Sequence, residues 1–303
     1  MFKEFYGNGK LLLTGEYAIL DGAKGLALPT SFGQFLKVES RTNTVTEWKS
    51  RDEKGAVWFD ASFDTHHLQL TSTSNTEIAT SLLKILSEAK KLNLDFLSKD
   101  DQNYTIETKV TFPRNWGLGT SSTLIANIAS WAHVNPYQLL EASFGGSGYD
   151  IACATHDTPI TYIKNGYEPH INNVDFNPVF ADQIFFVYLN QKKNSREAIT
   201  QYRTLDINKG VLISKINTMT EAILTCTNLS DFEMLLNEHE TLLSKTLHVP
   251  TIKNSLFQDY PNTIKSLGAW GGDFILVTGT ETDMDYFRHK GYSTILPYSE
   301  MIL

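Results

Sequence analysis

The sequence is poor in cysteine and has no long hydrophobic run. Its only cysteines, Cys153 and Cys226, lie far apart in the chain, and two are too few for a disulfide framework. No stretch of 18 consecutive apolar residues occurs, which argues against a transmembrane helix. Lys3, Glu4 and Lys10 interrupt the segment where a signal peptide would need an unbroken apolar region. We therefore expect a cytoplasmic protein, since two thiols suit a reducing compartment.

Basic residues are also scarce relative to acidic ones. The 303 residues include 26 Lys and Arg against 34 Asp and Glu, which gives a formal net charge of −8. A chain with this charge has no general basic surface for nucleic acid or for an anionic membrane. We therefore expect a small-molecule ligand, bound by a monomer or a homodimer, and an anionic ligand would need a local basic pocket. The length allows two domains that share a cleft, or one large domain.

The first part of the chain is predicted to be rich in strands and then in helices. β-branched and aromatic residues separated by turn residues indicate strands over residues 2–6, 10–20, 32–39, 44–49 and 56–61. Apolar residues at positions 78, 82, 85, 86 and 89 form one stripe of a helix over residues 75–91. The pattern then predicts a strand over residues 104–112, helices over residues 120–132, 136–144 and 148–156, and a strand over residues 160–163.

A stretch rich in Gly, Asn and Pro, residues 165–178, marks the expected boundary between two domains, residues 1–170 and 171–303. The second domain is predicted to contain a strand over residues 183–190, three or four helices between residues 195 and 268, a strand over residues 274–278, a short helix over residues 282–290 and a strand over residues 293–297. Strands segregated from a block of helices favour an α+β fold with antiparallel sheets covered on one face, and argue against a doubly wound parallel sheet.

The segment from Gly117 to Ser122 joins a predicted strand to a predicted helix. Gly117 and Gly119 allow backbone N–H groups to approach an anion, and the helix dipole and the hydroxyls of residues 120–122 favour phosphate or Mg²⁺ there. The alternative is that Thr120 or Ser121 only caps the helix after a glycine turn. The chain lacks both the P-loop and the Rossmann fingerprints, so phosphate binding would use another glycine loop.

Two further glycine-rich segments carry charged residues. In residues 145–150 (GGSGYD), Asp150 stands near the start of a predicted helix. It could be a catalytic base, with Lys10 as the nearest plausible cationic partner, or a helix N-cap, and composition alone favours the cap. Residues 265–273 (KSLGAWGGD) lie between a predicted helix and a predicted strand, either as a tight loop bearing on a site or as a helix C-cap followed by a turn.

Taken in order, these segments resemble the three signature motifs of the GHMP small-molecule kinases. Residues 9–20 (GKLLLTGEYAIL) resemble the opening strand motif, with Asn8 in the usual place of a proline. Residues 117–122 (GLGTSS) resemble the phosphate loop, with Thr120 for its first serine and Ser122 for its alanine. Residues 265–273 resemble the third motif, with Trp270 in place of a glycine. The resemblance extends from about residue 5 to residue 278.

This resemblance implies a two-lobed α+β fold, with an S5-like N-terminal lobe, a ferredoxin-like C-terminal lobe, and ATP and substrate in the cleft between them. It implies that Asp150 is the catalytic aspartate and Lys10 its partner, and that ATP is bound by Gly117, Leu118, Gly119, Thr120, Ser121 and Ser122. Ser121 would be a Mg²⁺ ligand. Glu141, nine residues before Asp150, resembles the second metal carboxylate at a spacing slightly shorter than usual. The implied cofactors are ATP and Mg²⁺.

Within the superfamily, the residues favour the mevalonate branch. Asp150 argues against homoserine kinase, and its GSGYD setting argues against the diphosphomevalonate decarboxylase. The implied activity is phosphorylation of mevalonate or phosphomevalonate, with substrate contacts from Lys192, Ser195, Arg196, Gly268, Ala269 and Gly271. Lys193 and Arg114 are further candidate cations for a substrate phosphate. The alternatives are a sugar kinase of the same superfamily, whose pocket Trp116 and Trp270 would change, and a degenerate member that binds a nucleotide or metabolite without catalysis.

Overall fold

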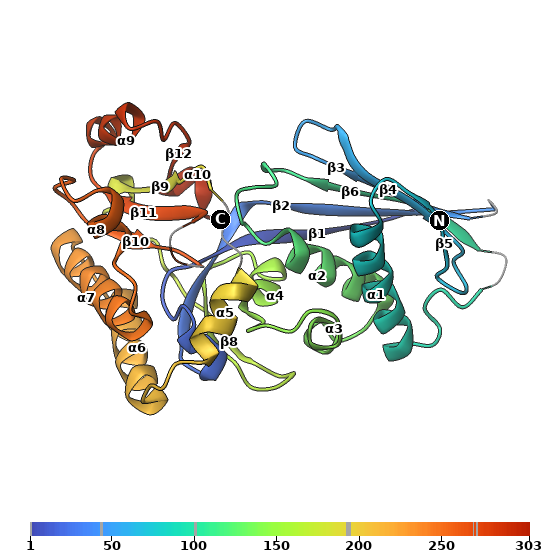
Figure 1. The fold of residues 1–303 in the computed structure, drawn as a ribbon, viewed down its shortest axis with the longest axis horizontal. Coiled ribbons are helices and arrows are strands. Elements are labelled where there is room, and N and C mark those ends of the chain that lie inside the picture. The colour runs from blue at the N-terminus through green and yellow to red at the C-terminus, as the bar shows by residue number, and fades with distance from the viewer. Residues whose placement is uncertain (1, 43–44, 100–101, 192–194, 269, 271) are drawn as a thin grey trace.

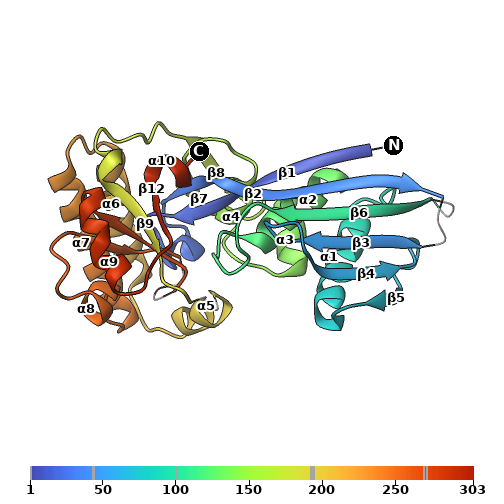
Figure 2. The same ribbon diagram turned by 90° about the horizontal axis from the view of Figure 1, so that it is seen from above.

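The structure is a computed structural model that describes residues 2–42, 45–99, 102–191, 195–268, 270 and 272–303. Two β-sheets organise these residues, an eight-stranded sheet from the first part of the chain and a four-stranded sheet from the second. The sheets lie towards opposite ends of an elongated molecule, and two long strands of the eight-stranded sheet, β1 (Phe2–Leu12) and β2 (Gly25–Arg41), extend from its outer end towards the four-stranded sheet (Figures 1 and 2). The predicted α+β fold class is confirmed.

The eight-stranded sheet carries four helices on one face. Its order is β5-β4-β3-β6-β2-β7-β8, with β1 paired to β2. The remaining strands are β3 (Thr46–Arg51), β4 (Val57–Phe63), β5 (Leu70–Thr73), β6 (Asn103–Val110), β7 (Ile160–Ile163) and β8 (His170–Asn173). The helices on this face are α1 (Thr76–Leu92), α2 (Thr120–Ala132), α3 (Pro136–Ser143) and α4 (Tyr149–Ala154), as Figure 1 shows.

Helix α1 illustrates why these helices pack against the sheet. Four residues of the predicted stripe are buried, Leu82, Ile85, Leu86 and Ala89, whereas Ile78 is half-buried and Ala79 is buried in addition. They enter a hydrophobic core that also contains buried aromatic side chains of β3 and β4. The Asn75 side chain accepts a hydrogen bond from the Ile78 N–H and caps the start of the helix.

The four-stranded sheet has the order β10-β11-β9-β12, and all of its neighbouring strands are antiparallel. Its strands are β9 (Ile184–Tyr188), β10 (Ile264–Ser266), β11 (Phe274–Thr278) and β12 (Ile295–Pro297). The helical segments of this part are η2 (Ala181–Gln183), α5 (Ser195–Arg203), α6 (Lys209–Leu224), α7 (Leu229–Leu247), α8 (Ile252–Leu256), η3 (Glu281–Met284), α9 (Asp285–His289) and α10 (Tyr298–Met301). Every residue of β9 and β11 is buried, which explains their continuous apolar sequences.

Residues 10–20 do not form the single strand that the sequence predicts. Strand β1 ends at Leu12, and the 3-10 helix η1 (Ala18–Asp21) follows a turn. Gly15 has a φ of 94° and Tyr17 a φ of 63°, left-handed conformations that a strand does not contain. The apolar residues of this run are buried because the turn itself is enclosed, so their pattern was misleading beyond Leu12.

Two further predictions about the sheets were wrong. Residues 264–266 form β10 rather than the end of a helical block, so residues 265–273 connect two antiparallel strands. Strands β3 and β6 are parallel, because α1 carries the chain from β5 at the edge of the sheet back to β6 in its interior. The sequence also did not predict β5, β8 and α10, which have four residues each and are too short for a clear periodicity.

The two parts of the chain are joined at several places. Strand β8 spans the expected boundary at residue 170 and pairs with β7 in the eight-stranded sheet. Near the C-terminus, Ile302 forms an isolated bridge with Thr30, and α10 packs against β2. The division into residues 1–170 and 171–303 stays a prediction. Within the described part of the chain, no helix combines the length and the apolar composition needed to span a bilayer.

Candidate active site

A pocket of about 590 Å³ lies between the helical face of the eight-stranded sheet and the second part of the chain. Its walls come from the end of β1, the turn around η1, the glycine loop before α2, the end of α3, the loop before α4, helix α5 and the connection between β10 and β11. The three motif segments singled out in the sequence therefore meet at one pocket.

The glycine loop presents backbone N–H groups to this pocket. Gly117 has a φ of 70° and Gly119, the N-cap of α2, has a φ of 94°. No side chain caps this helix, so the alternative in which Thr120 or Ser121 serves only as the cap is wrong. The first-turn N–H groups of a helix have no intrahelical partner and favour an anion. A side chain at Gly117 would overlap the Asp273 carboxylate, so the loop needs glycine there.

Lys10 and Asp150 face each other in the pocket. Lys10 Nζ lies 3.5 Å from Asp150 Oδ1 and donates a hydrogen bond to the Gly117 carbonyl oxygen at 3.1 Å. Asp150 is the second residue of α4, whose N-cap is Gly148, and no side chain caps this helix. The cap interpretation of Asp150, which composition favoured, is therefore wrong. The contact with Lys10 joins the first motif to the start of α4, as the resemblance implies.

The surroundings of Lys10 keep its ammonium charged. Burial opposes the charge, but Tyr149, Asp150 and Asp273 outweigh this effect and raise the pKa of Lys10 above its usual range. The backbone N–H of Lys10 also donates to the Leu118 carbonyl oxygen at 3.1 Å, which ties β1 to the glycine loop. A fixed positive charge thus lies beside both the loop and the Asp150 carboxylate.

Oxygen donors suited to Mg²⁺ line the same pocket. Ser121 is exposed in the first turn of α2, and Glu141 is exposed near the end of α3. Among the described residues, no group of three or more His, Cys, Asp or Glu side chains forms a metal site. Proteins commonly hold Mg²⁺ through one or two carboxylates together with the phosphates of a nucleotide. The ligand roles of Ser121 and Glu141 stay predictions.

No protein-family model matches the chain, and no curated protein matches it in sequence. Solved structures match it over nearly its whole length. A crystal structure of mevalonate kinase has a TM-score of 0.70 at 16% identity, covering 97% of this chain and 98% of the other. Galactokinase from Lactococcus lactis, complexed with galactose, has a TM-score of 0.70 at 14% identity, covering 100% and 93%. Phosphomevalonate kinase from Streptococcus pneumoniae, in complex with phosphomevalonate and AMPPNP, has a TM-score of 0.68 at 14% identity, covering 97% and 99%.

The chain has the GHMP kinase fold. The eight-stranded sheet with α1 to α4 is its N-terminal lobe, and the four-stranded antiparallel sheet with its helices is its C-terminal lobe. The two-lobed architecture expected from the motifs is confirmed. At identities of 13–16% the likeness establishes the fold, so the substrate has to be inferred from the residues of the pocket.

The residues predicted to contact the substrate differ in where the structure places them. Gly268 lines the pocket. Ser195 and Arg196 begin α5, whose later turns reach the pocket through Ile199, Thr200 and Arg203. Lys192, Lys193, Ala269 and Gly271 lie outside the described residues, so their proposed contacts stay predictions.

The structure places two cations in the pocket that the sequence did not single out. Lys164 follows β7 and donates to the Gly146 carbonyl oxygen at 2.8 Å. Arg203 is the last residue of α5 and is exposed within the pocket lining. Arg114, by contrast, stacks on the Trp58 ring, 3.4 Å from its centroid, and does not line the pocket. Neither Lys164 nor Arg203 lies in a motif, so only their positions next to a strand end and a helix end could have suggested them.

The two tryptophans that were expected to change the pocket are packed elsewhere. Trp270 is buried in a hydrophobic cluster with Ala18 and Tyr202. Trp116 packs edge-on against Phe32 and Phe274, with ring centroids 5.4 Å apart in each pair. Neither indole lines the pocket, so this reason for preferring a sugar kinase is removed.

Proposed function

We propose that the protein is an ATP- and Mg²⁺-dependent kinase that phosphorylates a hydroxyl group of mevalonate or phosphomevalonate. The observation that carries this proposal is the Lys10–Asp150 contact beside the uncapped glycine loop, all within one pocket. A protein that only binds a nucleotide needs such a loop, but it has no use for a carboxylate paired with a buried ammonium. These residues therefore favour catalysis over the non-catalytic alternative.

The residues of the pocket suit phosphoryl transfer. The N–H groups at the start of α2 would hold the phosphates of ATP, and Ser121 and Glu141 would hold Mg²⁺, which when bound neutralises charge on the phosphates. Asp150 would orient the acceptor hydroxyl and accept its proton as the hydroxyl oxygen attacks the terminal phosphorus of ATP, whose bond to the bridging oxygen breaks so that ADP leaves. Lys10 would stabilise the negative charge that develops on the transferred group. Phosphoryl transfer depends more on such positioning and electrostatics than on a strong base.

Lys164 and Arg203 support an anionic acceptor. The chain as a whole carries a net charge of −8 and would repel an anion, so an anionic acceptor needs local cations. The pocket provides Lys164 and Arg203 in addition to Lys10. A carboxylate or a phosphate on the acceptor would pair with these groups, and a neutral sugar would leave their charges unused.

A sugar kinase is the second candidate, because the galactokinase structure has the same TM-score, 0.70, as the mevalonate kinase structure. An assay of ADP release with mevalonate, phosphomevalonate, galactose and homoserine separates the possibilities. We expect turnover with mevalonate or phosphomevalonate and a phosphorylated product detectable by ³¹P NMR. Turnover with galactose alone would favour the second candidate. Nucleotide binding by calorimetry without turnover of any acceptor would favour the non-catalytic alternative.

A further inference from the structure

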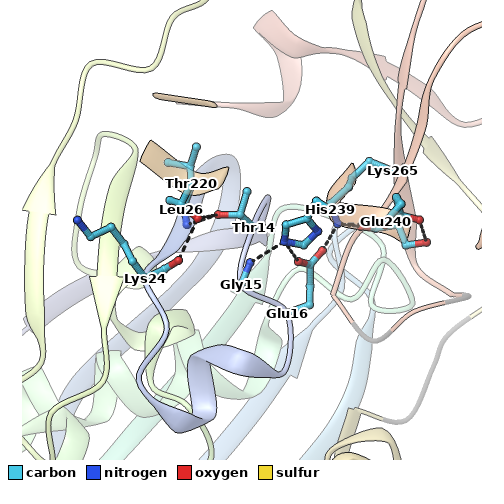
Figure 3. Close-up of polar contacts among 10 residues, drawn as sticks. Thr14, Gly15, Glu16, Lys24, Leu26, Thr220, His239, Glu240 and Lys265 are labelled. Atoms are coloured by element: carbon cyan, nitrogen blue, oxygen red, sulfur yellow. Dashed lines mark hydrogen bonds and ion pairs between the residues drawn. The ribbon is translucent and has the colours of Figure 1, made fainter. Parts of the chain in front are cut away.

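Four ionisable side chains are buried where the two lobes meet, and one of them, Glu16, also belongs to the pocket lining. They are Glu16, His239, Glu240 and Lys265, which we call the interlobe cluster (Figure 3). Their exposed fractions are only 0–2%. Glu16 belongs to the turn before η1, His239 and Glu240 to α7, and Lys265 to β10. The cluster therefore connects one element of the N-terminal lobe to two elements of the C-terminal lobe.

Lys265 lies at the centre of the interlobe cluster. Its ammonium donates to the Glu16 carboxylate and, at 2.6 Å, to the Ser266 carbonyl oxygen. Its Nζ lies 3.2 Å from Glu240 Oε1, and the Ser266 hydroxyl donates to Glu240 Oε2 at 3.0 Å. Glu16, Tyr17 and Gly268 all line the pocket, so the Glu16–Lys265 pair joins the wall formed by the turn around η1 to the wall formed by the loop after β10.

The contacts of His239 and the charge of its neighbours favour an additional proton in the interlobe cluster. His239 Nε2 accepts a hydrogen bond from the Gly15 N–H at 3.2 Å, so in the neutral ring the proton is on Nδ1. The same Nε2 lies 3.5 Å from Glu16 Oε2. Two acceptors then face each other unless a proton lies on the carboxyl group. With both carboxylates ionised, the buried cluster would also carry a net charge of −1, which is costly.

The pKa shifts agree with a proton on Glu16. Burial raises the pKa of Glu16 to about 7, against the opposing effect of Lys265. Burial, together with Lys265, lowers the pKa of His239 well below its usual range, so His239 stays neutral. Burial also raises the pKa of Glu240, and burial and the Glu16 charge raise the pKa of Tyr17 to about 12. Tyr17 therefore does not titrate near neutral pH.

We propose that Glu16 and Lys265 are positioning residues, which hold the turn at residues 14–17 against the loop after β10 only while the interlobe cluster retains its extra proton. Loss of that proton would set Glu16 Oε2 against His239 Nε2 and displace Tyr17 and Gly268 from the acceptor side of the pocket. The consequence for substrate binding rests on the proposed kinase function, whereas the protonation of the cluster does not.

Neighbouring contacts make this turn a fixed part of the interlobe contact. The Thr14 and Thr220 hydroxyls are hydrogen-bonded at 2.8 Å, and the Thr220 hydroxyl also donates to the Lys24 carbonyl oxygen at 3.0 Å (Figure 3). The Lys24 N–H donates to the Asn217 side chain at 2.7 Å. Helix α6 thus contacts Thr14 and Lys24, and α7 and β10 contact the residues between them. With the segment fixed in this way, we expect a change in the interlobe cluster to shift the residues of this segment that line the pocket.

The sign of the pH dependence follows from the raised pKa of Glu16. The pKa of Glu16 in the folded protein is about 7, above its ordinary value of 4.5. The stability that the protonated carboxyl contributes to the folded protein is therefore fully present below pH 4.5 and is lost as the pH rises through about 7. We expect the KM for the acceptor to rise about tenfold between pH 6 and pH 8 in the native protein, because the protonated fraction falls by that factor around a pKa of 7.

Glu16→Gln is the decisive variant, because its amide keeps the shape of the protonated carboxyl at every pH. We expect its acceptor KM to change less than twofold between pH 6 and pH 8, and its Tm to become independent of pH over that range. Glu221→Gln is the matched control, since Glu221 pairs with Lys24 in an exposed contact between the same turn region and α6. The control should follow the native protein in both measurements.

Thermal unfolding followed between pH 5.5 and pH 8.5 separates a failure of this proposal from a failure of the proposed function. The Tm measurement needs no substrate, so a difference in slope between the native protein and Glu16→Gln supports the protonated cluster even if every tested acceptor is inert. Parallel Tm curves for the native protein, Glu16→Gln and Glu221→Gln would overturn the protonated cluster. Parallel pH profiles of the acceptor KM, in a protein that does turn over, would overturn the positioning role.

Discussion

Asn8, the residue that stands in the usual place of a proline, is held in place by side-chain hydrogen bonds directly before Lys10, the proposed partner of Asp150. Its Nδ2 donates to the His156 carbonyl oxygen at 2.9 Å and to Asp157 Oδ1 at 2.8 Å. The pairing of β1 with β2 shifts register between Asn8 and Gly9, a bulge of the kind that often lies beside active sites. A proline could not make these side-chain contacts, so the departure from the motif replaces a rigid backbone with two hydrogen bonds directly before Lys10.

Replacing Asp150 by Asn should abolish most turnover while leaving the fold intact. The amide is nearly isosteric, but it cannot accept the hydroxyl proton or balance the Lys10 charge, so we expect kcat to fall by about 10²- to 10⁴-fold. Steady-state kinetics and thermal unfolding test this together. The exposed Asp182→Asn serves as the control. Near-native turnover in Asp150→Asn would remove Asp150 from the mechanism.

Replacing Ser121 by Ala should raise the Mg²⁺ concentration needed for half-maximal activity and weaken ATP binding. Loss of a hydroxyl ligand to a charged group costs about 1.5–3 kcal/mol, so we expect about a tenfold change or more. Because Ser121 is exposed, the Tm should stay unchanged. Ser130→Ala, at the other end of α2, is the control. Superimposable Mg²⁺ titrations of Ser121→Ala and the native protein would contradict the assignment.

At the scale of elements, six helices of this protein fall into two groups by the way they begin. Helices α1, α3, α6 and α7 begin at an asparagine whose side chain accepts from a first-turn N–H. Helices α2 and α4 instead begin at Gly119 and Gly148 in left-handed conformations, without a side-chain cap. The two helices that begin at a glycine are those whose N-termini line the pocket. N–H groups without a side-chain cap are available there to bind an anion. A cap would improve helix stability and occupy these donors.

Helix α5 provides a test of the acceptor's charge through Arg203. We expect Arg203→Met to raise the KM for an anionic acceptor about tenfold or more, and the KM for ATP less than twofold, because one charge-assisted contact is lost on the acceptor side. Lys215→Met, an exposed change on α6 outside the pocket, should alter neither value. Small, equal changes in both KM values for Arg203→Met would place the anionic group of the acceptor elsewhere.

At the scale of the whole molecule, the turn around η1 is enclosed between the lobes. Trp270 packs from the loop after β10 into a cluster that includes Ala18 and Ala23 from this turn region and Leu212 and Ile216 from α6. The motif that residues 265–273 resemble has a glycine where this chain has Trp270. Here the indole fills a space between the lobes, so the large residue is accommodated away from the ligand.

Replacing Trp270 by Ala should therefore destabilise the protein. Removal of a buried indole typically costs about 3–5 kcal/mol, through lost burial and the cavity that remains. Urea denaturation measures this change. Leu94→Ala is the control, since Leu94 is 79% exposed, and it should change stability by less than about 0.5 kcal/mol. A loss below about 1 kcal/mol for Trp270→Ala would show that the indole does not contribute to the contact between the lobes.

Much of the local structure could be predicted from the sequence. The stripe of α1, the strands at residues 160–163 and 274–278 and the helix at residues 120–132 follow from periodicity and turn residues, which act over a few positions. The turn at residues 14–17 could not, because apolar residues on both sides of it make the whole run from residue 10 to residue 20 fit a strand, whereas Gly15 and Tyr17 have positive φ values. Likewise β10 is three residues long and depends on pairing with β11.

The sequence by itself determined the order of the three motifs and hence the expected fold, since glycine spacing and hydroxyl placement are local properties. It left Asp150 between two roles, because the same residue type caps helices and accepts protons. Only the tertiary structure removed the cap role, since α4 begins at Gly148, and brought Asp150 to Lys10 from the far end of the lobe's sequence, while the catalytic role stays a prediction. The same holds for Arg203 in the pocket and for Lys265, which pairs with Glu16 across 249 positions of the chain. Such contacts depend on how the lobes pack together, and no local pattern specifies that packing.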